Sequence, residues 1–152
     1  MGANGVSVRE EREVVTAHGH PLISSTHKST FEVTKDEHLT ERGNCIIAVG
    51  ADKGAVDLNP TFKKLARRNG SEITITIRVD GLEETIKARG SRRLTFTDPK
   101  DLVVRKSRYT CGRTIAIEAD KAAVDLSRSL VERLKNPEQK VEVILTVRVR
   151  SV

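Results

Sequence analysis

The chain repeats itself, and this repeat constrains the fold more than any other feature of the sequence. Residues 51–58 recur at 119–126 with seven identities in eight positions, 68 residues later. The same spacing relates the alternating apolar run at 73–79 to a second run at 141–149. An internal repeat of this length predicts two copies of one supersecondary unit packed against each other.

The repeat extends upstream with a different spacing. Residues 31–34 match residues 94–97 at a spacing of 63. The sequence therefore predicts five extra residues in the second copy, between Arg105 and Ile115.

The length of 152 residues favours one domain with an internal duplication, residues 1–152. Half 1 covers about 13–80 and half 2 about 81–151, and neither is expected to fold alone. Asp80 and Gly81 lie between two alternating runs, which predicts a tight hairpin between the halves.

Strict alternation of apolar and polar residues at 73–79 and 141–149 predicts two half-buried strands. Similar alternation predicts further strands at 14–18, 29–33, 82–89 and 93–96, and short apolar runs predict strands at 47–49 and 115–117.

Each repeat also predicts a helix. Asp52 and Asp120 precede helical patterns and are expected as N-caps. In the first copy Asn59-Pro60 restarts the helix, because proline suits a first helical position. An inward-facing apolar stripe is expected in each copy: Phe62, Leu65 and Ala66, then Ala123, Leu126, Leu130 and Leu134. Capping-box spacing from Thr34 to Glu37 predicts a single helical turn, with a counterpart at Asp98-Pro99.

These elements predict a mostly β fold of about ten short strands and two helices. The expected architecture is two antiparallel sheets packed as a sandwich, built from two pseudo-two-fold related β-β-β-α-β halves. The alternative is an α+β layered sheet with the helices on one face.

Charge favours an anionic partner. The formal net charge is +6 and the pI about 9.6, but acidic residues are interspersed among the basic ones. Aromatic residues make up 3%, which argues against base-stacking platforms. The abundance of arginine and glutamate is typical of a heat-adapted protein. No apolar run reaches membrane-spanning length and residues 9–13 are charged, so a cytoplasmic protein without membrane contact is expected.

The common catalytic fingerprints are missing from the sequence: there is no P-loop, no dinucleotide-binding glycine motif, no nucleophile elbow and no Cys-x-x-Cys pair. No catalytic residue can be assigned, and whether the protein is an enzyme stays open.

Histidine and cysteine offer one candidate metal site. Zinc could be held by His18, His20, His27 and Cys45, although this spacing matches no standard zinc signature. The alternative is that His18 and His20 flank a turn and that His27 is solvated or bound to backbone.

The two cysteines, Cys45 and Cys111, each precede a repeated short strand and so are expected at nearly equivalent places. They could meet as a disulfide, act as functional thiols, or be two small buried thiols.

A basic cluster at 105–114 coincides with the expected insertion, where the symmetry of the halves breaks. Its arginines and lysine suit phosphate or carboxylate, and the alternative is a solvated basic loop. The candidate ligand-binding residues are His20, His27, Arg42, Arg105, Lys106, Ser107 and Arg113.

Several motifs in order resemble the archaeal family known as domain of unknown function 371. They are Gly19-His20, His27, Thr30, Glu32, Thr34, Leu39-Thr40, residues 42–46, Ala51-Asp52-Lys53, Arg105-Lys106-Ser107, Arg113-Thr114 and residues 119–123. The resemblance covers residues 13–150 and implies an archaeal origin and a mostly β, sandwich-like domain, but no activity. Asn44 departs from the aspartate expected beside the cysteine, so a base or ligand at that position would be absent.

Two function classes follow. The first is binding of a small anionic ligand, which could be a phosphorylated compound, at the basic site that contains histidine and cysteine. The alternative is a nucleic-acid-associated or oligomeric scaffold protein without catalytic activity, with Lys63, Lys64, Arg67 and Arg68 as a further patch.

Overall fold

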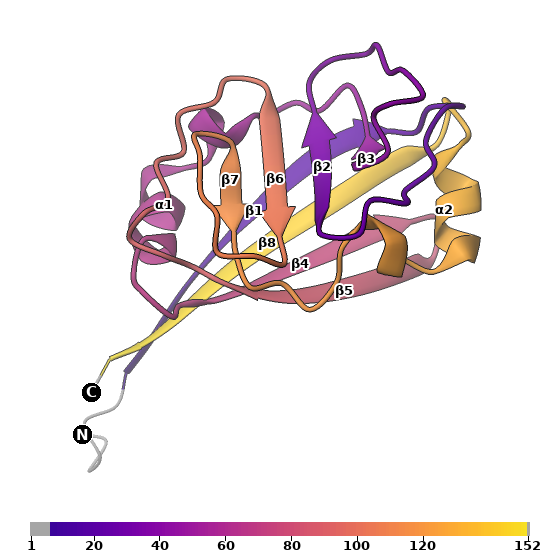
Figure 1. The fold of residues 1–152 in the computed structure, drawn as a ribbon. Helices are drawn as coiled ribbons and strands as arrows, with labels where there is room; N and C mark the ends of the chain where they lie inside the picture. The colour runs from indigo at the N-terminus through magenta and orange to yellow at the C-terminus, as the bar shows by residue number, and fades with distance from the viewer. Residues whose placement is uncertain (1–6, 152) are drawn as a thin grey trace.

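Two four-stranded sheets pack face to face in the computed structural model, which describes residues 7–151 (Figure 1). The large sheet has the order β1-β8-β4-β5 and is antiparallel throughout. Its strands are β1 (Ser7–His18), β8 (Lys140–Ser151), β4 (Glu72–Val79) and β5 (Leu82–Arg89).

The small sheet has the order β3-β2-β6-β7 and is mixed. Its strands are β3 (Ile46–Ala48), β2 (Thr30–Thr34), β6 (Asp101–Arg105) and β7 (Thr114–Ala116). The central pair β2–β6 is antiparallel, whereas the outer pairs β2–β3 and β6–β7 are parallel. The predicted mostly β, sandwich-like fold is confirmed, with the difference that only the large sheet is purely antiparallel.

The core lies between the sheets. Alternate residues of β4, such as Ile73, Ile75 and Ile77, face inward and are fully buried. Phe31 and Val33 of β2 point into the same core from the other side. Burying apolar surface from both sheets is the main stabilising contribution to such a fold.

Each repeat contributes a short 3₁₀ turn and a helix, rather than one continuous helix. The elements are η1 (Ala55–Asp57), α1 (Pro60–Ala66), η2 (Ala123–Asp125) and α2 (Arg128–Leu134). Leu58 ends η1 and Leu126 ends η2. Each has an extended backbone that separates the 3₁₀ turn from the following helix, and each side chain is buried. Figure 1 shows α1 and α2 at opposite ends of the molecule, so the helices cover the ends of the sandwich.

The capping residues differ in part from the prediction. Oδ1 of Asn59 accepts a hydrogen bond from the backbone N–H of Phe62 at 2.7 Å, so Asn59-Pro60 begins α1 as expected. Asp52 and Asp120 are not N-caps. Their carboxylates instead accept backbone N–H groups of Thr16 in β1 and Lys87 in β5.

Several predicted strands are confirmed and one is wrong. Asp80 and Gly81, both at positive φ, form the expected hairpin between β4 and β5. Residues 93–96 are not a strand, because the chain turns at Phe96, whose φ is 53°. The sequence reading missed β6, whose charged ends hide its apolar centre. No helical turn forms at 34–37, since Thr34 bonds to Asp36 N–H and to Asp101 instead.

Equivalent residues in the two halves, such as Glu13 and Glu84, are 71 positions apart up to the loops that precede β3 and β7, rather than 63. Lys53 binds the buried carboxylate of Glu13 at 2.8 Å, and Lys121 binds Glu84 in the same way at 3.1 Å. Glu13 also accepts the N–H of Asn59, and Glu84 accepts that of Ser127. The spacing of 68 holds only after the loops that precede β3 and β7.

The predicted insertion in the second copy is therefore wrong. Lys35 and Lys106 occupy equivalent places, because they form matched ion pairs with Asp57 and Asp125, each at 2.8 Å. Eleven positions separate Lys35 from Ile46, but eight separate Lys106 from Thr114. The first copy holds the longer loop.

The halves are interlocked. The N–H of Val124 in η2 donates to the carbonyl of His27, and the N–H of Val56 in η1 donates to that of Asp98. In addition, β1 pairs along its whole length with β8, which belongs to the other half. None of the helices in residues 7–151 is long and apolar enough to cross a membrane.

Candidate functional site

The outer face of the small sheet, turned away from the core, carries polar side chains. Alternation along β2 directs Phe31 and Val33 inward and leaves Thr30, Glu32 and Thr34 on the outer face. On β6 the outer residues are Asp101, Val103 and Arg105. The loops before β3 and β7 lie along this face and add Cys45, Cys111 and Arg113. We call this set the outer-face cluster.

Glu32 is the centre of the outer-face cluster and is buried, with 8% of its side chain exposed. Its Oε1 atom lies 3.3 Å from Nη1 of Arg113 and 3.8 Å from Sγ of Cys45. Burial, assisted by the nearby charge of Asp101, raises the pKa of Glu32 to about 7, although Arg113 acts in the opposite direction. Glu32 can therefore exchange a proton near neutral pH.

Arg113 bridges two carboxylates. Its Nη1 atom lies 3.3 Å from Glu32 and equally far from Oδ2 of Asp101. The other oxygen of Asp101 accepts the hydroxyl of Thr34 at 2.7 Å. Arg113 directly precedes β7, and its carbonyl accepts the N–H of Val103, which is fully buried. The guanidinium thus offsets the negative charge of two acidic side chains.

Arg105 has no carboxylate partner among residues 7–151. Its Nε donates to the hydroxyl of Thr114 at 3.1 Å, Nη2 lies 3.5 Å from Sγ of Cys111, and the guanidinium lies over the ring of Tyr109 at 4.9 Å. These contacts hold the side chain in place, and among them only the thiolate form of Cys111 offsets its charge.

The two thiols have opposite surroundings. Burial would raise the pKa of Cys111, but the N–H of Arg113, the Thr114 hydroxyl and the Arg105 guanidinium lower it to about 7. Burial and the neighbouring Glu32 carboxylate raise the pKa of Cys45 to about 11. Near pH 8, Cys111 is therefore mainly a thiolate, whereas Cys45 is mainly a neutral thiol.

The two cysteines were expected at nearly equivalent places, and in the structure they are two positions from equivalence. The N–H of Glu32 donates to the carbonyl of Cys45, and the N–H of Val103 donates to that of Arg113, each at 2.8 Å. Cys45 therefore corresponds to Arg113, and the equivalent of Cys111 is Gly43. Both thiols are free and half-buried.

Four of the predicted ligand-binding residues come together where β2 pairs with β6. Nδ1 of His27 accepts the N–H of Thr30 at 3.1 Å, and Thr30 faces Arg105 across the strands. The adjacent Lys106 donates its N–H to Ser29, but its ammonium is bound to Asp125. Ser107 follows directly, and its hydroxyl accepts the N–H of Tyr109.

The other three predicted ligand-binding residues lie elsewhere. Arg113 reaches the centre of the cluster, as described. Arg42 is exposed on the loop before β3 and forms no ion pair or hydrogen bond with any residue in 7–151. His20 lies near the end of α2, where its N–H donates to the carbonyl of Leu134.

The structure does not gather the predicted zinc ligands. His18 binds Glu37 at 2.6 Å, His20 accepts the N–H of Leu22, His27 accepts two backbone N–H groups, and Cys45 faces Glu32. Within residues 7–151, no three histidine, cysteine or acidic side chains are placed to hold a metal ion.

The sequence reading gave no site role to Glu32, Asp101 or Thr114. One signal could have found Glu32: it is a carboxylate flanked by Phe31 and Val33 in a strand whose five residues are all buried. Its equivalent in the second half is Val103, so the fold itself does not require an acid there.

Comparison with known proteins gives a family but no activity. A family model described as Domain of unknown function (DUF371) matches residues 15–148. An uncharacterized protein of Methanocaldococcus jannaschii is 43% identical over 122 residues, which cover 80% of this chain and 90% of the relative. The chain therefore belongs to the family described as Domain of unknown function (DUF371).

Proposed function

We propose that the protein binds a small anionic ligand, such as a phosphorylated compound, at the outer-face cluster, with Arg105 as the main contact. The observation that carries this proposal is the set of partners around Arg105: a hydroxyl, a thiol and an aromatic ring. A guanidinium that is fixed in place but lacks a carboxylate partner is ready to form charge-assisted hydrogen bonds with an anion.

The other cations of the site support this choice because they are already neutralised. Arg113 is shared by Glu32 and Asp101, and Lys106 is bound to Asp125 in a pair that the first half repeats with Lys35. We therefore assign Lys106 a structural role in this proposal, in place of the ligand contact expected from the sequence. Arg105 has no such counterpart, since Thr34 stands at the equivalent position of β2.

Two neighbouring groups would add chemistry to the bound anion. Nδ1 of His27 accepts backbone N–H groups, which leaves Nε2 as the nitrogen that can face a ligand. Glu32, with a pKa of about 7, adds a group that can donate or accept a proton. We propose proton exchange with the ligand as its role.

The test is the thermal shift caused by inorganic phosphate at constant ionic strength. Phosphate should raise the melting temperature of the natural protein relative to chloride, because binding to the folded state alone stabilises it. The variant Arg105→Met keeps the aliphatic stem but removes the charge, and should lose this shift.

The control is Arg133→Met, which removes an exposed arginine of α2 that pairs with Asp80 and lies outside the outer-face cluster. It should keep the phosphate-induced shift. The proposal is wrong if the natural protein shows no difference between phosphate and chloride, if the shift survives in Arg105→Met, or if Arg133→Met loses it as well.

A further inference from the structure

A second basic surface lies at the end of the large sheet where β1 begins and β8 ends. Three hollows of about 460, 330 and 200 Å³ adjoin there, because neighbouring hollows share Glu118, Arg148 or Gly70 in their walls. We call these three adjoining hollows the basic furrow. The arginines that line it are Arg68, Arg89, Arg93, Arg108, Arg148 and Arg150.

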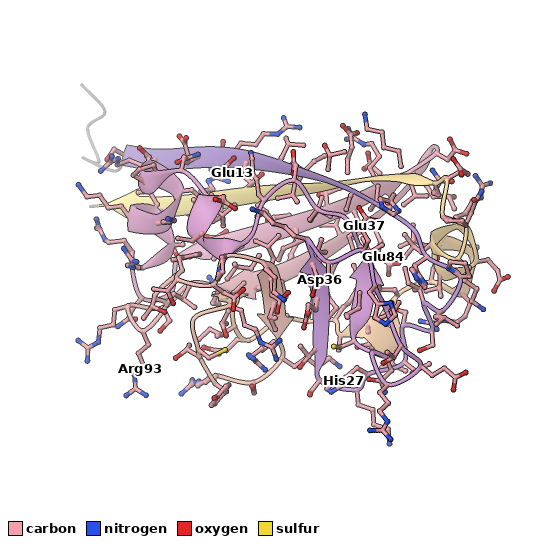
Figure 2. All side chains as sticks on the ribbon, turned by 90° about the horizontal axis from the view of Figure 1, so that it is seen from above. Glu13, His27, Asp36, Glu37, Glu84 and Arg93 are labelled. Atoms are coloured by element: carbon pink, nitrogen blue, oxygen red, sulfur yellow. The ribbon has the colours of Figure 1, made fainter. Side chains whose placement is uncertain are left out.

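The arginines of the basic furrow are all exposed and mostly unpaired. Arg108 forms an ion pair with Glu118 at 3.4 Å, and Arg89 donates to the carbonyl of Gly70. The other four form no ion pair with residues 7–151. Figure 2 shows Arg93 directed away from the body of the protein.

Charge is concentrated in this groove. Lys87 and the six arginines face three carboxylates, those of Glu10, Glu72 and Glu118. The excess of four positive charges is most of the net charge of +6 that the whole chain carries. Such a groove produces a positive potential that attracts anions over several ångströms.

The opposite end of the molecule provides an internal comparison. By the matched contacts of the two halves, Arg89 corresponds to His18 and Arg148 to Asp80. Arginines 68, 93 and 108 correspond in the same way to Asn136, Leu22 and Glu37. No cation is retained at these five equivalent positions, although the backbone contacts recur. The fold therefore does not require the arginines, which points to binding.

We propose that the basic furrow binds the phosphodiester backbone of a nucleic acid. Arginine presents a planar fork of donors that matches phosphate, and several arginines along one groove suit a chain of phosphates rather than a single ion. None of the side chains that line the three hollows is aromatic, so bases would not be stacked. Binding should therefore have little sequence preference and depend steeply on salt.

This proposal is independent of the small-anion site, because the two surfaces share no residue. Lys63 and Arg67 of the helix patch expected from sequence are occupied by backbone carbonyls, namely those of Val56, Leu94 and Thr95. Arg68 is the member of that patch that lines the basic furrow.

The experiment is fluorescence anisotropy with labelled 20-nucleotide single-stranded RNA and with DNA duplexes of mixed sequence, over a range of sodium chloride concentrations. The double variant Arg93→Gln/Arg148→Gln should bind at least about tenfold more weakly. The dependence of its affinity on salt concentration should weaken by the amount expected for the loss of about two phosphate contacts. The RNA and DNA arms show which nucleic acid supplies the backbone.

The control is Arg133→Gln/Lys135→Gln, which removes two positive charges from the opposite end. It should change the affinity less than about twofold. If both double variants lost affinity equally, the loss would follow from net charge rather than from the basic furrow, and the proposal would be overturned. So would the absence of binding at 50 mM salt, or binding to vesicles that contain phosphatidylserine without binding to either nucleic acid. Arg105→Met should bind nucleic acid normally, whatever its response to phosphate.

Discussion

Nη1 of Arg113 lies 3.3 Å from Oε1 of Glu32, although the two residues belong to different halves of the chain. The acid comes from β2 and the guanidinium from the loop before β7, and the structural equivalents of both are different residues, Val103 and Cys45. The contact therefore exists once. The backbone of the small sheet repeats, whereas its outer face carries a single asymmetric cluster.

We expect Glu32 to make the stability of the protein depend on pH. Its pKa is raised from the ordinary 4.5 to about 7, so between these values the folded state binds more protons than the unfolded state. Stability should therefore fall as pH rises from about 4.5 to 7, by on the order of 2 to 3 kcal/mol from this group. Chemical denaturation of the natural protein and of Glu32→Gln from pH 4 to 8 measures the difference. If the two curves run parallel, Glu32 does not carry the effect.

Cys111 should be alkylated faster than Cys45. Arg105, Thr114 and the N–H of Arg113 lower its pKa to about 7, whereas Cys45 faces a carboxylate and has a pKa of about 11. At pH 7.5, mass spectrometry after brief iodoacetamide treatment should show modification at Cys111 and little at Cys45. Arg105→Met should raise the pH at which Cys111 reacts, and equal labelling of both thiols would contradict the assignment.

The buried ion pairs near the helices should be important for stability. Glu13 is buried and binds both Lys53 and the N–H of Asn59, so Glu13→Gln leaves the lysine without a charged partner. We expect a loss of about 3 kcal/mol in the free energy of unfolding, typical of a broken buried pair. Glu83→Gln, at the exposed pair with Arg78, should cost less than about 1 kcal/mol. Urea denaturation distinguishes them, and equal losses would argue against the buried pair.

Gly90 should tolerate no side chain. A Cβ atom there would lie 2.1 Å from the carbonyl oxygen of Ala66 at the end of α1, and one at Gly19 would lie 2.3 Å from that of Leu134 at the end of α2. Because these two carbonyl oxygens belong to the backbone, Gly90→Ala and Gly19→Ala should each destabilise by more than about 2 kcal/mol. Gly43→Ala meets the flexible Leu39 side chain and should cost less. Melting temperatures of the three variants test this order.

The halves should fold only together. Separate fragments 7–80 and 81–151 each lack strand partners, since β1 and β4 pair with β8 of the other half. Circular dichroism of either fragment alone should show little sheet, and mixing should restore it. A stable, cooperatively unfolding fragment would show that the duplication contains two independent units.

The long strands, the hairpin and the two helices could be predicted because local pattern determines them: alternation in β4, β5 and β8, and the Asn59-Pro60 start of α1. The helix caps could not, because Asp52 and Asp120 find strand N–H groups that are distant in sequence. The correct alignment of the two copies before β7 could not be predicted either. The apolar residues at 94–97 resemble a strand, whereas the actual strand, β6, carries Asp101 and Arg105 at its ends.

The candidate site was predictable only in part. The basic run at 105–113 and His27 were identified from charge and spacing, and the structure places His27 just before β2 and Arg105 at the end of the neighbouring strand β6. The partners that determine their chemistry were not visible, because Asp101 and Arg113 reach Glu32 only through the antiparallel pairing of β2 with β6. The histidines that the sequence suggested for zinc lie on different elements: His18 is in β1, His20 is near the end of α2 and His27 precedes β2.

The pairing of Ser7 with Ser151 places the first and last described residues side by side on adjacent antiparallel strands (Figure 1). A short linker across this point would form a second hairpin, comparable to the one at Asp80-Gly81. The order in which the strands are connected is therefore separable from the way they pack. The chain can be closed at its ends and reopened at the natural hairpin, and such a circular permutant should keep both the outer-face cluster and the basic furrow.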